Sequence, residues 1–255
     1  MFSPGKTPDS ETSAAAGGSA VAGWLTATSV CLAILVGGCD GRSAREPGRI
    51  RNTPSIAAQV EAVRNGAASR IEAREPLTDE EWKSLRGLAG LEELILHAGV
   101  ADDARADVLA TLPDIERLVL RESPLSDEGV QRLSVLTKLR DLNVPQAGCT
   151  AAGIQALAGL KNLRSLRLGG PRLEGAAVGE AVAELGGLRS LHLIDVPLGD
   201  EGLAAIARLP SLWNLYLDGA GVSDEAWAEY FQVHPRVHVH VDQAHHDRDP
   251  RRGHD

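Results

Sequence analysis

Histidines gather near the C-terminal end of the chain, and their spacing is the first feature that suggests chemistry. His238 and His240 are separated by one residue, so on an extended strand they would point to the same face. Asp242 follows two residues later, and His245 and His246 lie just beyond it. Imidazoles and a carboxylate at this spacing are potential ligands for Zn²⁺ or Cu²⁺. One interpretation is therefore a His-rich metal-binding protein of the cell envelope.

The competing interpretation of these histidines is a polar edge strand that runs into a His-rich tail. Ligand spacing as loose as this is common by chance in segments of biased composition. We therefore assign no metal ligand and no cofactor from the sequence, and keep metal binding as an alternative that a titration with zinc can test.

No catalytic signature accompanies the histidines. The chain has no nucleophile elbow, no Gly-rich phosphate loop leading into a helix and no paired His-Glu motif on one helix. Its net charge of −9 disfavours a phosphate backbone as a partner, and its 3% of aromatic residues are too few for base-stacking platforms. The 43% of hydrophobic residues predict a folded protein. The lack of catalytic motifs predicts that it is not an enzyme, and its charge and few aromatic residues predict that it does not bind nucleic acid.

Cys39 is a second chemically informative residue, because it ends a long apolar stretch. Residues 19–38 carry no charged side chain, so they suit a membrane-spanning helix or the apolar part of a signal peptide. The stretch ends in the sequence LVGGC, which resembles the bacterial lipobox. The resemblance implies that residues 1–38 are a signal peptide and that Cys39 is lipidated. The mature protein would then be a lipoprotein anchored on the extracytoplasmic side of a membrane in the cell envelope.

The charges around this stretch leave another interpretation open. The preceding segment has one lysine, Lys6, against Asp9 and Glu11, whereas the segment that follows is rich in arginine. An uncleaved helix with that asymmetry would hold the rest of the chain in the cytoplasm. The alternative is a cytoplasm-facing adaptor at the inner membrane. In both cases residues 39–54, rich in Gly, Pro, Ser and Arg, are expected to form a flexible tether.

Most of the remaining chain is a repeat. Of 34 leucines, 31 lie between Leu77 and Leu217. The pattern divides residues 77–242 into seven units of about 24 residues, a period typical of solenoids. The units begin at Leu77, Val100, Leu125, Cys149, Leu173, Leu198 and Val222.

Each unit changes its hydrophobic period partway along. In the third unit, apolar residues recur every three positions from 130 to 136, which predicts a short helix, and every second position from 142 to 144, which predicts a strand with one buried face. Ser126 precedes the helix as an expected N-cap, and Thr78 with Glu81 matches a capping box in the first unit. A single unit of this kind cannot bury its apolar face, so the units are expected to stack into one continuous core.

The repeats resemble the leucine-rich-repeat family. Segments such as LRDLNV, LRSLRL and LWNLYL match its L-x-x-L-x-L strand core, and SDEGVQRL resembles the helical half of its bacterial and cysteine-containing subtypes. The resemblance implies an α/β solenoid with a curved parallel sheet on its concave face and short helices on its convex face. The family's asparagine after each strand is absent, so the turn backbone groups need other partners. The corresponding residues are Gly99, Ser123, Ala147, Pro171, Val196 and Ala220.

The two ends of the solenoid need caps, because a terminal repeat otherwise exposes its core. Residues 55–76 are interpreted as a degenerate N-terminal cap with a helix over 55–64 and a strand over 70–73. In the last unit, Trp227 and Tyr230 replace smaller apolar residues and are expected to close the core. Residues 243–255 have no apolar periodicity and are expected to be disordered.

Binding residues are expected at the strand positions between the leucines, which form columns on the concave face. Arginine, histidine and tyrosine collect in the C-terminal half of these columns, and Tyr and Arg are frequent anchors of protein interfaces. The sequence therefore predicts recognition of an unidentified protein partner through this half of the face. The candidate residues are Arg167, His192, Asn214, Tyr216, His238 and His240.

Overall fold

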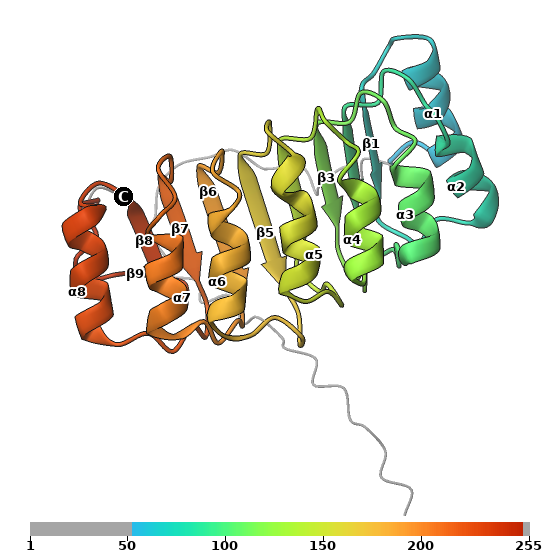
Figure 1. Ribbon diagram of the computed structural model, residues 1–255. Coiled ribbons are helices and arrows are strands. Elements are labelled where there is room, and N and C mark those ends of the chain that lie inside the picture. The colour runs from blue at the N-terminus through green and yellow to red at the C-terminus, as the bar shows by residue number, and fades with distance from the viewer. Residues whose placement is uncertain (1–52, 252–255) are drawn as a thin grey trace, which may run out of the picture. The chain divides into compact units, whose positions relative to one another are not determined.

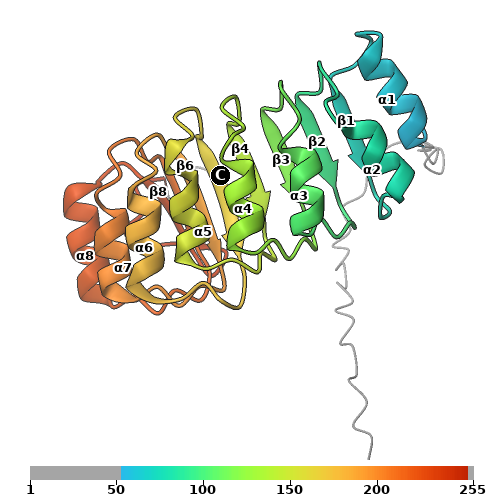
Figure 2. The ribbon, with the colours of Figure 1, turned by 45° about the vertical axis from the view of Figure 1, so that its right-hand side comes forward.

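A computed structural model describes residues 53–251, which form a single curved row of helix–strand units (Figure 1). Nine strands make one sheet in the order of the sequence, from β1 to β9. Every neighbouring pair from β1 to β8 is parallel, and β9 is antiparallel to β8. The helices line up on one side of this sheet, as the turned view in Figure 2 also shows. This is the α/β solenoid expected from the repeat.

The elements are short and regular. The helices are α1 (Ile56–Arg64), α2 (Asp79–Leu85), α3 (Asp103–Leu109), α4 (Asp127–Leu133), α5 (Ala151–Gln155), the 3-10 helix η1 (Ala156–Gly159), α6 (Gly175–Ala183), α7 (Gly199–Ile206) and α8 (Asp224–Val233). The strands are β1 (Arg70–Ala73), β2 (Glu93–Leu96), β3 (Arg117–Leu120), β4 (Asp141–Val144), β5 (Ser165–Gly169), β6 (Ser190–Ile194), β7 (Asn214–Leu217), β8 (His238–Val241) and β9 (Ala244–His245).

The repeat leucines fill the space between sheet and helices. Leu118, Leu142 and Leu166 occupy equivalent positions on β3, β4 and β5, pair in register, and are at most 1% exposed. The same layer continues through the sheet, so one unbroken core runs along the solenoid. Cys149 belongs to it, and burial raises the pKa of its thiol to about 11, so this cysteine is a small buried apolar residue.

The ends of the row have the expected elements. Ser55 caps α1 by accepting a hydrogen bond from the N–H of Ala58, and β1 pairs with β2. The capping box of Thr78 and Glu81 is present at α2. At the other end Trp227 and Tyr230 are 3% and 2% exposed and pack edge to face, so they cover the last layer of leucines.

A ladder of aspartates links neighbouring units at the starts of their helices. Asp127, the first residue of α4, accepts hydrogen bonds from the N–H and hydroxyl of Thr150 at 2.6 and 2.8 Å and from the N–H of Gly153 at 3.0 Å. Thr150 is the N-cap of the next helix. Asp103 and Asp200 bind the N-cap serines of their following units in the same way. The carboxylate of one unit thus fixes the helix start of the next.

The ladder explains glycines inside the helix starts. A Cβ at Gly129 would lie 2.1 Å from the carboxylate of Asp103, and one at Gly153 would lie 2.8 Å from that of Asp127. Both glycines are therefore needed for the carboxylates to approach. The ladder is missing where Ala151 and Gly175 replace the aspartate, and α6 accordingly begins without a side-chain cap.

The backbone groups in the turns after the strands form hydrogen bonds although no asparagine ladder is present. The hydroxyl of Ser123, which is fully buried, donates to the carbonyl of Gly99 at 3.0 Å and accepts from the N–H of Ala101 at 3.2 Å. Elsewhere backbone groups pair between units, for example the N–H of Ala147 with the carbonyl of Gly169 at 2.7 Å. Neighbouring turns therefore satisfy one another.

The C-terminal segment differs from the sequence prediction. Residues 243–251, expected to be disordered, fold back on the last repeat strand and contribute β9. The turn places Asp242 and Gln243 at φ angles of 49° and 65°, and the side chain of Asp249 is completely buried. Hydrogen bonds of a buried carboxylate hold this segment, and apolar periodicity gives no signal of such a contact.

The N-terminal predictions fall outside the described residues. They concern the signal peptide or anchor helix over 1–38, the lipidation of Cys39, and all but the last two residues of the tether over 39–54. Within residues 53–251, none of the helices has the length and apolar character needed to cross a membrane.

Candidate functional site

The register of the sheet brings the predicted binding residues together. Arg167 pairs with His192, His192 with Tyr216, and Tyr216 with His240, so these four form one column across β5 to β8. Asn214 and His238 pair in the adjacent column. All six side chains point away from the core, because each flanks or lies between the buried apolar residues of its strand.

Rings stack along this part of the concave face. The centroid of Tyr216 lies 5.4 Å from that of His192 and 5.0 Å from that of His240. Nε2 of His192 lies 3.0 Å from the carboxylate of Asp218, which orients the ring. The aromatic side chains are therefore held in place before any partner arrives.

A shallow hollow of about 210 Å³ opens beside these rings. Arg167, His192 and Tyr216 line it, together with Asn143 and Arg117 from the strands before. Nε of Arg167 and Oδ1 of Asn143 are buried without a hydrogen-bond partner, and Arg167 forms no ion pair with any other described residue. A buried polar atom without a partner costs about 1–3 kcal/mol, so these two atoms mark the hollow as a place for a polar ligand group.

The N-terminal half of the concave face has a different character. Its charges neutralise one another: Arg70 lies 2.6 Å from Glu72 and 3.2 Å from Glu93, and Glu93 lies 3.2 Å from Arg117. His97 is 2.8 Å from Glu72. Hydrogen bonds from Arg70 and His97 hold the pKa of Glu72 below its ordinary value. The charged side chains of β1, β2 and β3 on this face are therefore paired with one another, in contrast to Arg167.

The C-terminal histidines form a compact cluster. The ring centroids of His238, His240 and His245 lie 4.1 to 4.9 Å apart. Behind them the carboxylate of Asp249 lies 2.8 Å from Nδ1 of His238 and 3.4 Å from Nδ1 of His245. Burial raises the pKa of Asp249, but hydrogen bonds, led by those from the backbone N–H groups of Arg251 and Val239, outweigh burial and keep the pKa low.

Two residues of the sequence-based metal hypothesis do not join this cluster. Asp242 instead accepts a hydrogen bond from the N–H of Gly219 at 2.8 Å, and the ring of His246 packs 4.8 Å from that of Trp227. Asp249 was missed, because the segment that carries it was expected to be disordered. Its position four residues after His245 was the one available signal.

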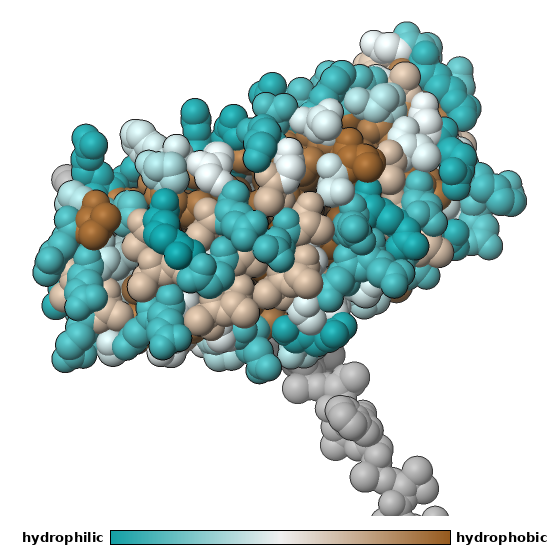
Figure 3. Space-filling model, viewed as in Figure 1, coloured by the Kyte–Doolittle hydropathy of each residue, from teal (hydrophilic) through white to brown (hydrophobic). Residues whose placement is uncertain are grey.

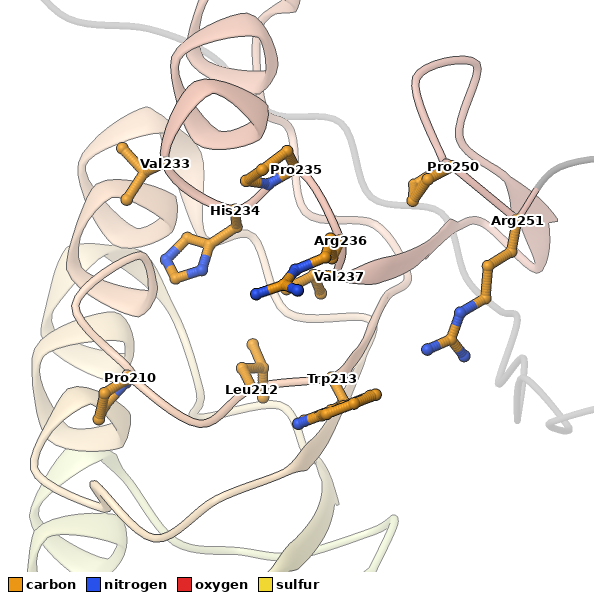
Figure 4. Close-up of a pocket in the computed structure, with 10 residues that line it drawn as sticks. All are labelled: Pro210, Leu212, Trp213, Val233, His234, Pro235, Arg236, Val237, Pro250 and Arg251. Carbon is orange, nitrogen blue, oxygen red and sulfur yellow. The ribbon is translucent and has the colours of Figure 1, made fainter.

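A larger hollow, also missed, lies at the edge of the last units and not on the concave face. It measures about 720 Å³ and is lined by residues of the α7–β7 and α8–β8 loops and of the C-terminal segment (Figure 4). Trp213 is 60% exposed there, and Arg236 faces the same hollow. An exposed tryptophan beside an arginine is a second possible anchor for a protein.

The opposite, helix-covered surface has a hollow of about 480 Å³ between α7 and α8, where the buried hydroxyl of Tyr230 has no hydrogen-bond partner among the described residues. Hydrophilic side chains cover most of this surface, with weakly hydrophobic residues over its middle (Figure 3). The concave face has in addition a cation without an ion-pair partner within residues 53–251, Arg167, and the edge hollow has an exposed tryptophan, so these two places are the better candidates for contact.

Together, the parallel sheet, the helix on each crossover and the inward leucine layers define a leucine-rich-repeat solenoid. Among solved structures, the chain is similar to internalin C2 of Listeria monocytogenes, with a TM-score of 0.52 and 21% sequence identity over 71% of this chain and 74% of that chain. It is also similar to internalin F of the same organism, with a TM-score of 0.39 and 17% identity over 62% of this chain and 56% of that chain. At 21% identity, the likeness to internalin C2 concerns the fold alone.

No protein-family model matches the sequence, and no curated protein does so.

Proposed function

We propose that this chain recognises another protein through the C-terminal half of its concave face. The observation that carries the proposal is Arg167, a cation without an ion-pair partner within residues 53–251, in a hollow that it shares with His192 and Tyr216. The leucine-rich-repeat fold supports it, since a rigid curved sheet presents side chains of many strands to one partner.

The chemistry of the hollow suggests what the partner presents. A guanidinium binds carboxylates with two parallel hydrogen bonds, and Asn143 adds an acceptor beside it. Tyr216 supplies rigid apolar area with little loss of conformational entropy. We therefore expect an acidic side chain of the partner at Arg167, flanked by apolar contacts on Tyr216.

The test replaces Arg167, His192 and Tyr216 together with Ala. These side chains lie on the sheet surface, so the fold should persist, whereas capture of the partner from a cell-envelope extract should fall at least about tenfold, as loss of interface anchors implies. A matched triple variant, Gln131→Ala, Glu201→Ala and Glu229→Ala, alters exposed helix residues and should capture normally. Quantitative mass spectrometry of the captured proteins gives the comparison.

Unchanged capture by the concave-face variant would refute the proposed surface. Trp213→Ala then shows whether the edge hollow is the contact instead, since that change removes its most exposed aromatic side chain.

We further propose that the protein is a lipoprotein, anchored through Cys39 outside the cytoplasmic membrane. The sequence LVGGC at the end of the uncharged stretch supports this. The rival proposal is a cytoplasm-facing adaptor on an uncleaved helix, which the arginines after the stretch favour.

The intact mass of the chain from the membrane fraction distinguishes the two. Lipidation predicts a chain that begins at Cys39 and carries added acyl mass, and Cys39→Ser should abolish both changes. An unmodified chain that retains Met1 would contradict the lipoprotein and favour the cytoplasmic adaptor. The partner search would then move from the envelope to cytoplasmic proteins.

A further inference from the structure

The hairpin of β8 and β9 assembles three imidazoles from two strands. His238 and His240 lie two residues apart on β8 and therefore share its concave side. The tight turn at Asp242 and Gln243 reverses the chain and sets His245 directly opposite His240. One nitrogen from each of the three rings lies within 4.8 Å of the others.

This spacing is close to what a metal ion requires. Zn–N bonds of about 2.0–2.1 Å in a tetrahedral arrangement place the ligand nitrogens about 3.4 Å apart. Small rotations of these partly buried imidazoles would close the remaining distance. Three histidines leave a fourth position for water or for a side chain of a partner.

Asp249 supplies the support that such ligands need. Its buried carboxylate accepts hydrogen bonds from the N–H of Val239 at 2.9 Å and of Arg251 at 2.8 Å, so it is fixed in place. Its Oδ2 lies 2.8 Å from Nδ1 of His238, a contact of ion-pair distance without hydrogen-bond geometry, and is 3.4 Å from Nδ1 of His245, with which it forms a hydrogen bond. A carboxylate behind an imidazole fixes the orientation of the ring and increases its basicity as a ligand, which is the usual outer-shell arrangement of histidine metal sites.

We propose that His238, His240 and His245 bind one divalent transition-metal ion of the zinc class, with Asp249 as the positioning residue. Imidazole nitrogen is a preferred ligand of zinc, copper and nickel, and the set has no oxygen-rich character that would favour calcium or magnesium. Because Nδ1 of His238 and His245 faces Asp249, Nε2 of both rings is assigned to the metal.

The test is calorimetric titration of zinc chloride into the full chain, prepared without a histidine tag and freed of metal with a chelator. We expect one ion per chain with sub-micromolar affinity. His245→Ala should weaken binding at least about tenfold, and Asp249→Asn should weaken it by about tenfold to a hundredfold. His97→Gln is the matched control, because His97 also lies on the concave face beside a carboxylate, and should leave the affinity unchanged.

Co²⁺ gives a second readout, since three-histidine coordination intensifies its visible absorption. The intense spectrum should appear in the parent chain and in His97→Gln and be lost in His245→Ala. Circular dichroism confirms that the variants are folded. The proposal is overturned if zinc binds no tighter than micromolar, or if folded His245→Ala and His240→Ala bind zinc as tightly as the parent chain.

Discussion

Gly179→Ala is expected to lower the free energy of unfolding by about 2 kcal/mol, which reduces the folding equilibrium constant about thirtyfold. Gly179 lies in α6 where this helix packs against α7 (Figure 1). A Cβ there would lie 2.4 Å from the carbonyl oxygen of Gly202 and 2.7 Å from its Cα. Both atoms belong to the backbone, so the clash can be relieved only if the two helices move apart.

The sign of this prediction depends on two opposing effects. Alanine favours a helix interior over glycine by about 1 kcal/mol, which alone would stabilise the variant. Separating two packed helices costs more, because the buried contacts around Val178 and Val182 are disturbed along with the clash itself. The net effect is therefore destabilising.

Gly186→Ala is the control for Gly179→Ala. A Cβ at Gly186 would meet no atom within 4 Å, and its φ angle is not positive. The free energy of unfolding of Gly186→Ala should differ from that of the parent chain by no more than about 0.5 kcal/mol. Urea denaturation followed by circular dichroism measures both variants, and equal stability of Gly179→Ala and the parent chain would contradict the close packing of α6 on α7.

The fold was largely predictable because it depends on periodic residues. Buried leucines at fixed phases identify one strand and one helix in each unit, and stacking is the only way to bury them all. For the same reason the columns of the concave face could be read in advance: once Leu166 and Leu191 are known to point inward, Arg167 and His192 must lie side by side on the other face.

Features that depend on single polar contacts could not be predicted in this way. The ladder from Asp127 to Thr150 needs the relative position of two units to within about an ångström, which a hydrophobic pattern does not give. Asp249 lies in a segment with no apolar period, yet its hydrogen bonds return that segment to the sheet. A polar sequence at the end of a chain is therefore weak evidence for disorder when a buried carboxylate can anchor it.

The candidate site was predictable only in part for a related reason. Sequence position places Arg167 and Tyr216 on the concave face, but only the structure shows that the arginines and acids of the N-terminal half pair with one another. Pairing determines which charges are left to bind a partner. The prediction that the C-terminal half makes the contact rested on residue types, and the lack of an ion-pair partner for Arg167 within residues 53–251 is an independent argument for the same half.

Asp127→Ala is expected to lower the free energy of unfolding at neutral pH by about 2–3 kcal/mol. The change removes three hydrogen bonds between units and leaves the N–H groups of Thr150 and Gly153 without this carboxylate acceptor. The N–H of Gly153 keeps its second acceptor, the carbonyl of Thr150 at 3.1 Å, so the N–H of Thr150 bears the larger loss. The change also removes a carboxylate from the first turn of α4, where the helix dipole favours negative charge. Chemical denaturation at pH 7 gives the stability difference.

Asp224→Ala is the control that distinguishes the contribution of the ladder to stability from that of the helix dipole. Asp224 follows the N-cap Ser223 as Asp127 follows Ser126, but it lies in the last unit, with no further repeat to bind. Both variants lose the dipole interaction, worth about 0.3–1 kcal/mol at an exposed site, and only Asp127→Ala loses the bonds between units. Similar losses in the two variants would mean that the ladder contributes little to stability.

The dependence of stability on pH provides an independent check on the ladder. Burial raises the pKa of Asp127, but the hydrogen bonds from Thr150 and Gly153 and the charge of Arg172 outweigh it, so the folded pKa lies below the ordinary value of 3.8. A carboxyl whose pKa is lowered by folding stabilises the protein above its unfolded pKa, and this contribution is lost as the pH falls through the folded value. The parent chain should therefore lose stability more steeply than Asp127→Ala below about pH 4. The remaining slope of the variant comes from the other carboxyl groups whose pKa values are lowered, which are Asp249, Asp200, Asp114 and Glu72. Parallel curves for the two proteins would show that Asp127 does not hold its neighbour as described.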